Sequence, residues 1–246
     1  ATNAQAEDRV LWLSLGDNIT NAASLDAAIN YADTNNFNAV CILARYRANA
    51  YYIPNRDFST YTNPEPRVST SIDTVQYVID RAKEKDLRVY AAWSVYAVTD
   101  GTNTLPGFLN EDWRTEVYKD VVDDGPGDET NTSYTPDAGF PRKQNTTDDS
   151  TGLWLDPGVP AVTTYNQDII LDFLENYDVD GIILDRIRFP GDGFPRYTES
   201  YGYNDLALQE YFDNGKISSL TPAPGDTDFL EARRDAVSDF IESTQS

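Results

Sequence analysis

Apolar residues recur along this chain in two alternating patterns, short uninterrupted runs and longer stretches with helical spacing. The uninterrupted runs lie within residues 10–15, 37–44, 87–93 and 182–184. A short apolar run bounded by polar or turn residues is typical of a strand buried on both faces, as in a parallel sheet. We therefore predict four buried parallel strands.

Stretches in which apolar residues recur every three or four positions lie between and after these runs, and this spacing predicts amphipathic helices. Ser24 and Ser71 precede the first two stretches and have side chains that cap helix N-termini. The third helix follows Pro157 and is expected to bury Val162, Ile169, Ile170, Phe173 and Leu174. Two more helices are predicted over residues 204–212 and 228–242, the last with an inner face of Leu230, Val237, Phe240 and Ile241.

The alternation of strand and helix indicates an α/β protein with a parallel sheet and outer helices. Long connections follow the strands, over residues 48–70 and 99–152, and favour a (β/α) barrel over a doubly wound sheet. No linker-like break in composition divides residues 1–246, so we expect a single domain. Four strands are half of such a barrel. We expect either part of a longer chain or a half-barrel completed by a partner, because soluble proteins avoid exposed apolar strand edges.

A carboxylate, Asp185, ends the fourth predicted strand, and two arginines follow it. In parallel α/β proteins the chemistry takes place just beyond the carboxyl ends of the strands. Strand alternation places Asp185 on one face with Gly181 and Ile183, so it would project into a pocket if that face lines a barrel. We expect Arg188 to lower the pKa of Asp185 and keep it ionised, as a catalytic nucleophile requires. The alternative is structural: Asp185 would only pair with Arg45 or Arg188 and close the strand ends.

Aromatic and arginine side chains gather at the same predicted strand ends and in the loops that follow them. Sugar binding needs flat aromatic surfaces and planar hydrogen-bonding groups. The candidate substrate-binding residues are Arg45, Arg47, Tyr51, Trp93, Trp154 and Arg188, with Tyr46 and Tyr96 at similar positions. Arg45 and Arg47 would bind sugar hydroxyls or the carboxylates of an acidic glycan. Taken singly, each aromatic ring could instead pack in the core or within a loop.

Composition restricts the chemistry of this site. The chain of 246 residues has 41 acidic and 19 basic residues, a formal net charge of −22, no histidine, and one cysteine, Cys41. Without histidine, Ser-His-Asp and Cys-His catalysis and His-ligated metal sites are excluded. The negative charge repels nucleic acid and anionic membranes, and no apolar run approaches the roughly 18 residues of a membrane span. We predict neither a nucleic-acid partner nor membrane insertion, and expect Cys41 to be a small core residue.

Five blocks of the chain resemble, in the same order, those of the glycosyl-hydrolase-like family 10 proteins, and they cover most of its length. They are residues 39–54, 87–93, 154–158, 177–190 and 232–237, of which 177–190 is the most specific. The resemblance implies a TIM-barrel glycoside hydrolase, secreted or on the cell surface, that cleaves a polysaccharide by carboxylate acid/base chemistry. Two departures stand out. Ile183 occupies a position where members often carry a polar residue, and the family's barrel continues beyond the last block.

Hydrolysis of a glycosidic bond typically uses two carboxyl groups, and the partner of Asp185 is not evident in the sequence. Asp156 precedes a predicted helix and is better explained as its N-cap, while Asp192 and Glu199 lie in the loop after the fourth strand. A second hypothesis therefore stays open: a non-catalytic surface or filament-forming structural protein that self-associates on the same scaffold.

The sequence predicts no cofactor, and calcium is the one metal for which it offers a candidate segment. Residues 123–129 are rich in acidic side chains, whose oxygens are the ligands that calcium prefers. Their spacing does not fit an EF-hand, and a solvated acidic loop is the alternative.

The acidic excess is of the kind that salt-loving proteins tolerate, because salt screens the repulsion between like charges. On the hypothesis of a saline habitat, we expect the urea midpoint of unfolding to rise between about 0.01 M and about 1 M salt, where the Debye length falls from roughly 30 Å to roughly 3 Å. An ordinary acidic secreted protein is the alternative, and full stability in dilute buffer would favour it.

Overall fold

The structure, a computed structural model, describes residues 7–13, 21–56, 59–68, 70–99, 104–118, 142–144, 152–190, 201–223 and 225–244. The chain forms two compact units, and each is described by itself. Unit 1 comprises Ala1–Val95 and Asn166–Arg186, and unit 2 comprises Tyr96–Tyr165 and Ile187–Ser246.

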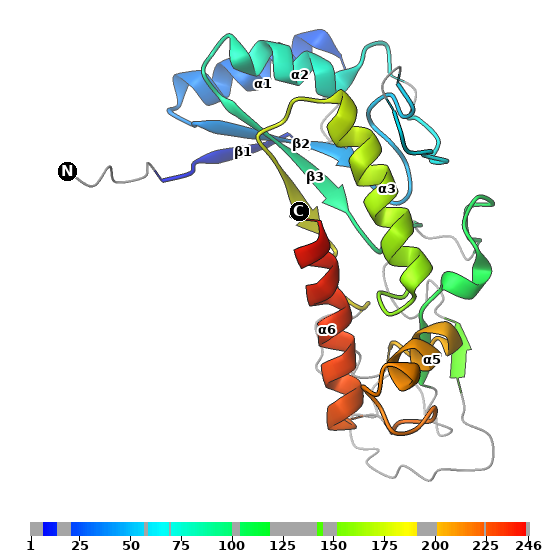
Figure 1. Cartoon of the computed structure of the whole chain (residues 1–246). Helices are drawn as coiled ribbons and strands as arrows, with labels where there is room; N and C mark the ends of the chain where they lie inside the picture. The colour runs from blue at the N-terminus through cyan, green and yellow to red at the C-terminus, as the bar shows by residue number, and fades with distance from the viewer. Residues whose placement is uncertain are drawn as a thin grey trace, which may run out of the picture. The chain divides into compact units, whose positions relative to one another are not determined.

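The described part of unit 1 is built on a sheet of four parallel strands (Figure 1). Their order in space, β1-β2-β3-β6, is also their order along the chain. A doubly wound sheet changes direction at a switch point, whereas consecutive order is what a (β/α) barrel requires. The predicted α/β, barrel-type fold is therefore confirmed, and these residues supply four strands of it. The strands are β1 (Val10–Leu13), β2 (Ala39–Arg45), β3 (Arg88–Ser94) and β6 (Gly181–Asp185).

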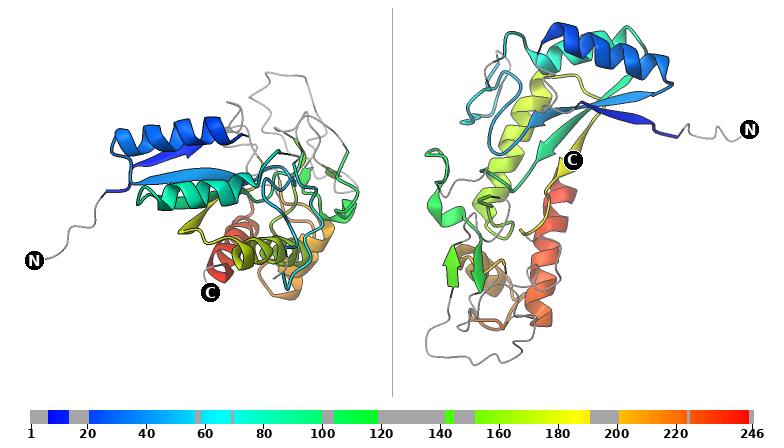
Figure 2. Two further views of the ribbon diagram at one scale, coloured as in Figure 1. Left: turned by 90° about the horizontal axis from the view of Figure 1, so that it is seen from above. Right: turned by 180° about the vertical axis from the view of Figure 1, so that it is seen from behind.

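Helices α1 (Ala22–Thr34) and α2 (Thr74–Lys83) connect consecutive strands and lie beside each other along the sheet (Figures 1 and 2). Each turns an apolar stripe to the interior, where the burial of these side chains stabilises the layer of helices against the sheet. The buried residues of the two stripes include Leu25, Ile29 and Ala32 of α1 and Val75, Val78, Ile79 and Ala82 of α2.

The N-caps of these two helices differ from the prediction. The side chain of Asn21 accepts a hydrogen bond from the backbone N–H of Ser24 at 3.0 Å. The side chain of Asp73 does the same for Gln76 at 3.2 Å. Ser24 and Ser71 are therefore not the caps, because Ser24 already lies in the first turn and Asp73 is the residue that precedes α2.

Helix α3 (Pro160–Asn176) belongs to unit 1 from Asn166 onward and packs against one face of the sheet. The ring centroid of Phe173 lies 5.4 Å from that of Trp93 on β3. Ile169 and Ile170 are buried as predicted, but Leu174 is 44% exposed. Leu174 lies about 100° further round the helix than Phe173, which carries it out of the buried stripe.

The strand register places Asp185 on the face of the sheet opposite to α3. Leu184 lies beside Trp93, and Asp185 lies beside Ser94. Because side chains alternate along a strand and Trp93 packs on α3, Asp185 projects from the other face. This agrees with the sequence expectation that Asp185 shares a face with Gly181 and Ile183.

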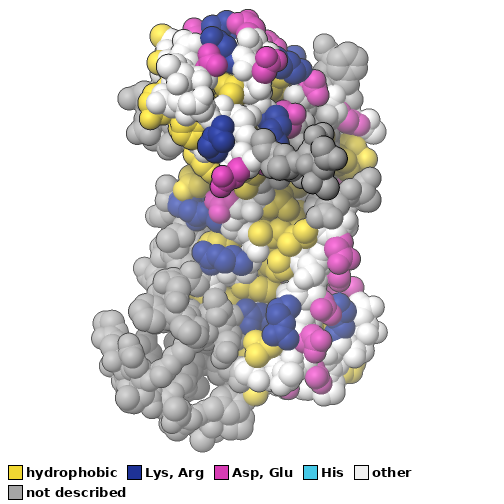
Figure 3. Space-filling model, turned by 90° about the vertical axis from the view of Figure 1, so that its left-hand side faces the viewer, with side chains coloured by type: hydrophobic (Ala, Val, Ile, Leu, Met, Phe, Trp, Pro, Cys, Tyr) yellow, Lys and Arg dark blue, Asp and Glu magenta, His cyan; other side chains and the backbone are white. Residues whose placement is uncertain are grey.

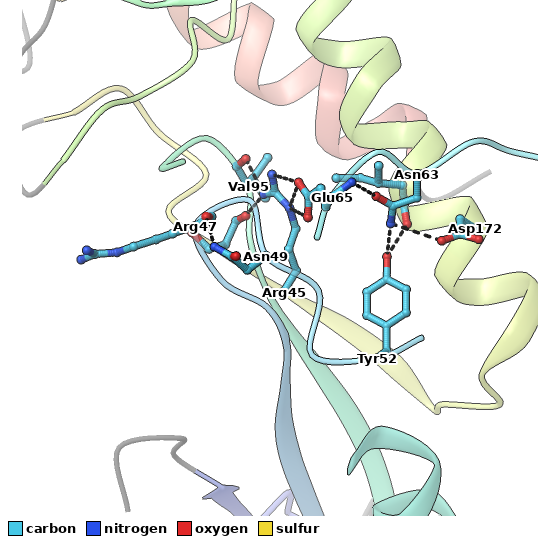
Figure 4. A network of polar contacts seen from close by, with 10 residues as sticks. Arg45, Arg47, Asn49, Tyr52, Asn63, Glu65, Val95 and Asp172 are labelled. Atoms are coloured by element: carbon cyan, nitrogen blue, oxygen red, sulfur yellow. Dashed lines mark hydrogen bonds and ion pairs between the residues drawn. The ribbon is translucent and has the colours of Figure 1, made fainter. Parts of the chain in front are cut away.

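A buried ion pair fixes the loop that follows β2 (Figure 4). The guanidinium of Arg45 donates to both carboxylate oxygens of Glu65 at 2.6–3.0 Å, and neither side chain is exposed to solvent. Its remaining nitrogen donates to the carbonyls of Ser94 and Val95, the latter at 2.9 Å. Strand β2, the end of β3 and the loop are thus tied together by one side chain.

The same loop is also clamped onto α3. The amide of Asn63 donates to the hydroxyl of Tyr52 at 2.6 Å and to the carboxylate of Asp172 at 3.2 Å (Figure 4). Its side-chain oxygen accepts from the backbone N–H of Glu65 at 2.9 Å. Asp172 also accepts from the backbone N–H of Asn55 at 3.1 Å. The described part of this long loop is therefore an ordered element of unit 1, held by buried polar groups that satisfy one another.

Unit 2 contains regular structure in a region that the sequence analysis treated as irregular. Among the described residues of 99–152, the structure has the short helix η2 (Glu111–Trp113) and the antiparallel pair β4 (Glu116–Tyr118) and β5 (Arg142–Gln144). Strands of three residues carry too little periodicity to be recognised. Two helices complete the described part, α5 (Asp205–Asp213) and α6 (Thr227–Ser243).

The inner face of α6 agrees with the prediction in part. Its buried residues are Phe229, Ala232, Arg233 and Phe240. The other predicted residues, Leu230, Val237 and Ile241, are half-buried, and Val237 packs against Phe189 and Tyr201. The guanidinium of Arg233 lies over the rings of Phe229 and Phe189 at 5.6 and 4.3 Å. None of the described helices is long and apolar enough to cross a membrane.

We expect Glu65→Gln to lower the free energy of unfolding by about 3–5 kcal/mol, because it leaves the buried guanidinium of Arg45 without its counter-ion. Asp178→Asn is the matched control, since Asp178 pairs with Lys83 where both side chains are largely exposed, and solvent screening leaves such a pair with little effect on stability. Urea titration followed by circular dichroism measures both changes. Equal losses from the two variants would contradict the central role of the buried pair.

Candidate functional site

The carboxyl ends of β2 and β6 carry the charged side chains of unit 1 that are best placed for chemistry. Asp185 is the last residue of β6, and its side chain is 55% exposed. Its backbone carbonyl accepts a hydrogen bond from Val95 at 2.9 Å, which anchors the strand end while the carboxylate remains open to solvent. An exposed carboxylate at such a strand end is where parallel α/β folds place catalytic groups.

Arg186 lies beside Asp185. The backbone N–H of Arg186 donates to one carboxylate oxygen of Asp185 at 2.8 Å, and its Nε lies 3.9 Å from the other. Within unit 2 the guanidinium of Arg188 stacks over the Trp154 ring at 5.0 Å, and its effect on the ionisation of Asp185 stays a prediction. Arg186 has a φ of 53°, in the left-handed region.

The ring of Tyr46, directly after β2, lies close to two guanidinium groups. The guanidinium carbon of Arg47 is 4.8 Å from its centroid, and that of Arg186 is 5.5 Å away. Both distances are in the range of cation–π contacts. Figure 4 shows the Arg47 side chain extending away from the Arg45–Glu65 network, so the two arginines of this strand end have separate roles.

Ionisation in this cluster reflects both burial and neighbouring charge. Burial lowers the pKa of Arg47, the Tyr46 hydroxyl opposes that change, and the positive charge of Arg186 adds to it. Burial raises the pKa of Tyr51, and the neighbouring Tyr46 raises it further. The structure therefore brings together Asp185, Arg47 and Tyr51 of the predicted set with Tyr46 and Arg186. We name these five residues the strand-end cluster.

Left-handed backbone conformations accompany this cluster. Arg47, Ala48 and Arg186 have φ values of 52°, 55° and 53°. Residues other than glycine adopt this region at a cost, and such conformations concentrate at functional sites. A strand pattern in the sequence gives no sign of these left-handed positions, so sequence reasoning did not single out Arg186.

Four of the predicted substrate-binding residues are buried. Arg47 is 8% exposed, and Arg45, Trp93 and Trp154 have no solvent-exposed surface. Trp93 packs between Tyr52 and Phe173, with centroid distances of 5.8 and 5.4 Å. This geometry favours the alternative that the predicted aromatic residues pack in the core. Contact of these buried residues with a ligand stays a prediction.

Asp156, the alternative carboxylate, lies in the core of unit 2. It is fully buried, and its oxygens accept hydrogen bonds from Thr115 Oγ1 at 2.8 Å and Gly158 N at 2.9 Å. Burial raises its pKa to about 6, although these hydrogen bonds and the charge of Arg233 act in the opposite direction. The Tyr211 hydroxyl occupies the space that a Cβ at Gly158 would need. Asp156 therefore organises the turn before α3 and is closed off from any substrate.

The remaining candidates fall outside the described residues. These are Asp192, Glu199 and the acidic residues 123–129. Within the residues that the structure does describe, no group of three or more acidic or cysteine side chains is arranged to hold a metal ion. Cys41 is buried, and burial raises the pKa of its thiol to about 12, as expected for a core residue.

Comparison with known proteins identifies related folds. The family model described as glycosyl hydrolase-like 10 matches residues 7–246. No curated protein matches the chain. Among solved structures, α-L-fucosidase isoenzyme 2 from Paenibacillus thiaminolyticus matches with a TM-score of 0.52 and 14% identity, over 96% of this chain. This chain spans only 30% of the fucosidase chain. At that identity the likeness is one of fold.

Two further solved structures match less closely. A glycoside hydrolase family 20 β-N-acetylglucosaminidase has a TM-score of 0.45 and 11% identity, covering 94% of this chain and 50% of its own. A cycloisomaltooligosaccharide glucanotransferase from Paenibacillus sp. has a TM-score of 0.42 and 17% identity, covering 93% of this chain and 30% of its own.

We expect the buried Asp156 to make stability depend on pH. Its pKa is about 6 in the folded state and about 3.9 in the unfolded state, so between these values the folded state binds more protons. Its contribution is therefore most favourable below about pH 4 and is lost as pH rises through 6, a change on the order of 2–3 kcal/mol. Asp156→Asn removes it, so the variant should gain stability relative to wild type between pH 4 and pH 7.

Asp178→Asn provides a control of opposite sign, because a hydrogen bond from Lys83 lowers the pKa of Asp178. This variant should lose stability relative to wild type as pH rises. Urea unfolding at a series of pH values measures both differences. If the difference in unfolding free energy between Asp156→Asn and wild type does not change with pH, the prediction is wrong. Asp156 would then have the same pKa in the folded and unfolded states.

Proposed function

We propose, from the premise that this chain belongs to the glycosyl hydrolase-like 10 family, that it is a secreted or cell-surface glycoside hydrolase acting on a polysaccharide. Asp185 is its catalytic carboxylate, and the strand-end cluster forms part of its sugar-binding surface. The location and the substrate class follow from the family resemblance of the sequence, and belong to the proposal.

The observation that carries the proposal is the different placement of the acidic residues around β6. Asp178 pairs with Lys83 at 2.6 Å, and Asp180 accepts a hydrogen bond from the backbone N–H of Val89 at 2.8 Å. Both precede the strand and have structural partners in neighbouring elements. Asp185 alone of the three stands at the carboxyl end, exposed and next to a guanidinium.

Asp185 could take either of two carboxylate roles in the hydrolysis of a glycosidic bond. The backbone N–H of Arg186 donates to one of its carboxylate oxygens at 2.8 Å. In a retaining mechanism a carboxylate oxygen bonds to the anomeric carbon while an acid protonates the departing glycosidic oxygen. In an inverting mechanism the carboxylate takes a proton from the attacking water. The acid is not Asp156, since that side chain is enclosed in the core of unit 2.

The alternative is a non-catalytic surface or filament-forming structural protein. It is favoured by the enclosure of Asp156, which leaves Asp185 as the one strand-end carboxylate assigned within the described residues. Such a protein would use the strand-end cluster, if at all, for binding and not for hydrolysis.

We expect Asp185→Asn to abolish hydrolysis, with a loss on the order of 10³-fold or more in kcat, because the amide carries no negative charge. The measurement is the release of reducing sugar from a panel of purified neutral and acidic polysaccharides. Asp178→Asn is the matched control, which removes an exposed carboxylate before the same strand and should retain full activity. Circular dichroism checks that both variants are folded.

Two results would overturn the catalytic proposal. One is a wild-type protein that releases no reducing sugar from any polysaccharide of the panel, which would favour the non-catalytic alternative. The other is an Asp185→Asn variant as active as wild type, which would place the reaction elsewhere in the chain.

A further inference from the structure

The sheet of unit 1 has two open edges. Among the residues that the structure describes, β1 pairs only with β2, and β6 pairs only with β3. The backbone N–H of Asp180 donates to the carbonyl of Val89 at 2.8 Å, towards β3. Because the backbone groups of successive residues point to alternate sides of a strand, Gly181 and Ile183 turn theirs to the open side of β6. Such an edge can pair with a further strand.

One face of the same sheet carries exposed apolar side chains. The register aligns Trp12 of β1 with Tyr90 of β3 and Gly181 of β6, so Trp12 lies on the face that also carries Ile183 and Asp185. Trp12 is 53% exposed, and Tyr90 and Ile183 are half-buried. Hydrophobic side chains are also at the surface, among charged ones, in the view of Figure 3. An apolar face beside an unpaired strand edge is typical of a surface that another protein segment covers.

A second copy of this chain fits both the edges and the face. Four strands in consecutive parallel order are half of an eight-stranded (β/α) barrel. Two such sheets, related by a twofold axis along the barrel, can pair β6 of each copy with β1 of the other. All strands then keep the same direction, as the barrel requires. Both open edges of both copies are used, and the two apolar faces turn towards each other.

The charges beside the two edges are complementary. Arg9 directly precedes β1 and Asp180 directly precedes β6, and both side chains are exposed. Parallel pairing brings the beginnings of the two strands to the same end of the barrel. Arg9 of one copy and Asp180 of the other therefore come to the same rim, where opposite charges attract.

We propose that two copies of this chain close one barrel, with β6 of each copy paired in parallel with β1 of the other. The pairing itself does not depend on the proposed function, but its consequence for the site rests on it. Strands that all run in one direction have their carboxyl ends at one mouth, so each copy contributes one Asp185 there. Hydrolysis of a glycosidic bond typically uses two carboxyl groups, and the two Asp185 side chains supply them.

The oligomeric state of the full chain tests the pairing. Sedimentation velocity is measured over a series of protein concentrations in about 1 M salt, where a Debye length of roughly 3 Å screens the repulsion between two chains of net charge −22. We expect one reversible step from the 27.5 kDa chain to a species of twice that mass. No larger species should form at high concentration, because closure uses both edges of each copy.

Variants identify the edges that pair. Trp12→Glu on β1 and Ile183→Glu on β6 should each raise the Kd of the dimer on the order of 30-fold or more, because each places a charge where apolar side chains meet. Tyr31→Glu is the matched control, since Tyr31 on α1 is 56% exposed, against 53% for Trp12. It should leave the Kd unchanged. Circular dichroism checks that all three variants are folded.

The proposal is overturned if the chain keeps the mass of one copy at every concentration, or if it forms open assemblies that grow with concentration. It is also overturned if Tyr31→Glu weakens the dimer as much as Trp12→Glu. Dissociation by Ile183→Glu but not by Trp12→Glu would overturn it as well, because the copies would then pair through β6 alone.

Failure of this pairing is distinct from failure of the proposed hydrolase. A chain that stays monomeric and still hydrolyses a polysaccharide would refute only the pairing. A dimer that depends on Trp12 and Ile183 but releases no reducing sugar from any polysaccharide would refute only the catalysis.

Discussion

The buried pair of Arg45 and Glu65 is the interaction on which the rest of unit 1 depends. Two charges are taken fully out of solvent, and the arrangement is stable because each nitrogen of the guanidinium donates to an oxygen. It bonds to a carboxylate from the loop and to two carbonyls at the end of β3. One of those carbonyls belongs to Val95, whose N–H bonds in turn to the carbonyl of Asp185. The positions of the loop, of β3 and of the candidate catalytic residue are therefore set together.

Two arginines that lie two residues apart have different surroundings in this structure. Arg45 ends β2 inside the protein, where Glu65 neutralises its charge. Arg47 is also buried, but its side chain extends away from that network and its backbone is left-handed. Its guanidinium lies against the ring of Tyr46, and the guanidinium of Arg186 lies near the same ring.

The carboxylates divide in the same way. Asp156 is enclosed, bonded to Thr115 and Gly158, and its pKa is raised to about 6 by burial. Asp185 stands in solvent beside a guanidinium. A buried carboxyl that shapes a turn and an exposed one at a strand end can be told apart only when their surroundings are known. Chemistry on a glycan requires the second kind of environment, because the group must reach the anomeric carbon or the attacking water.

The sequence by itself determined the alternation of strands and helices, the consecutive parallel order, the position of Asp185 at a strand end, and the family. These features are encoded by apolar periodicity and by motifs a few residues long. Tertiary structure alone decided that Arg186 lies beside Asp185, that Asn21 and Asp73 cap their helices, and that Arg45 and Trp93 are interior. Partners such as Arg45 and Glu65, or Tyr46 and Arg186, are far apart along the chain. Their pairing depends on how the whole sheet, loop and helix pack, which no local pattern contains.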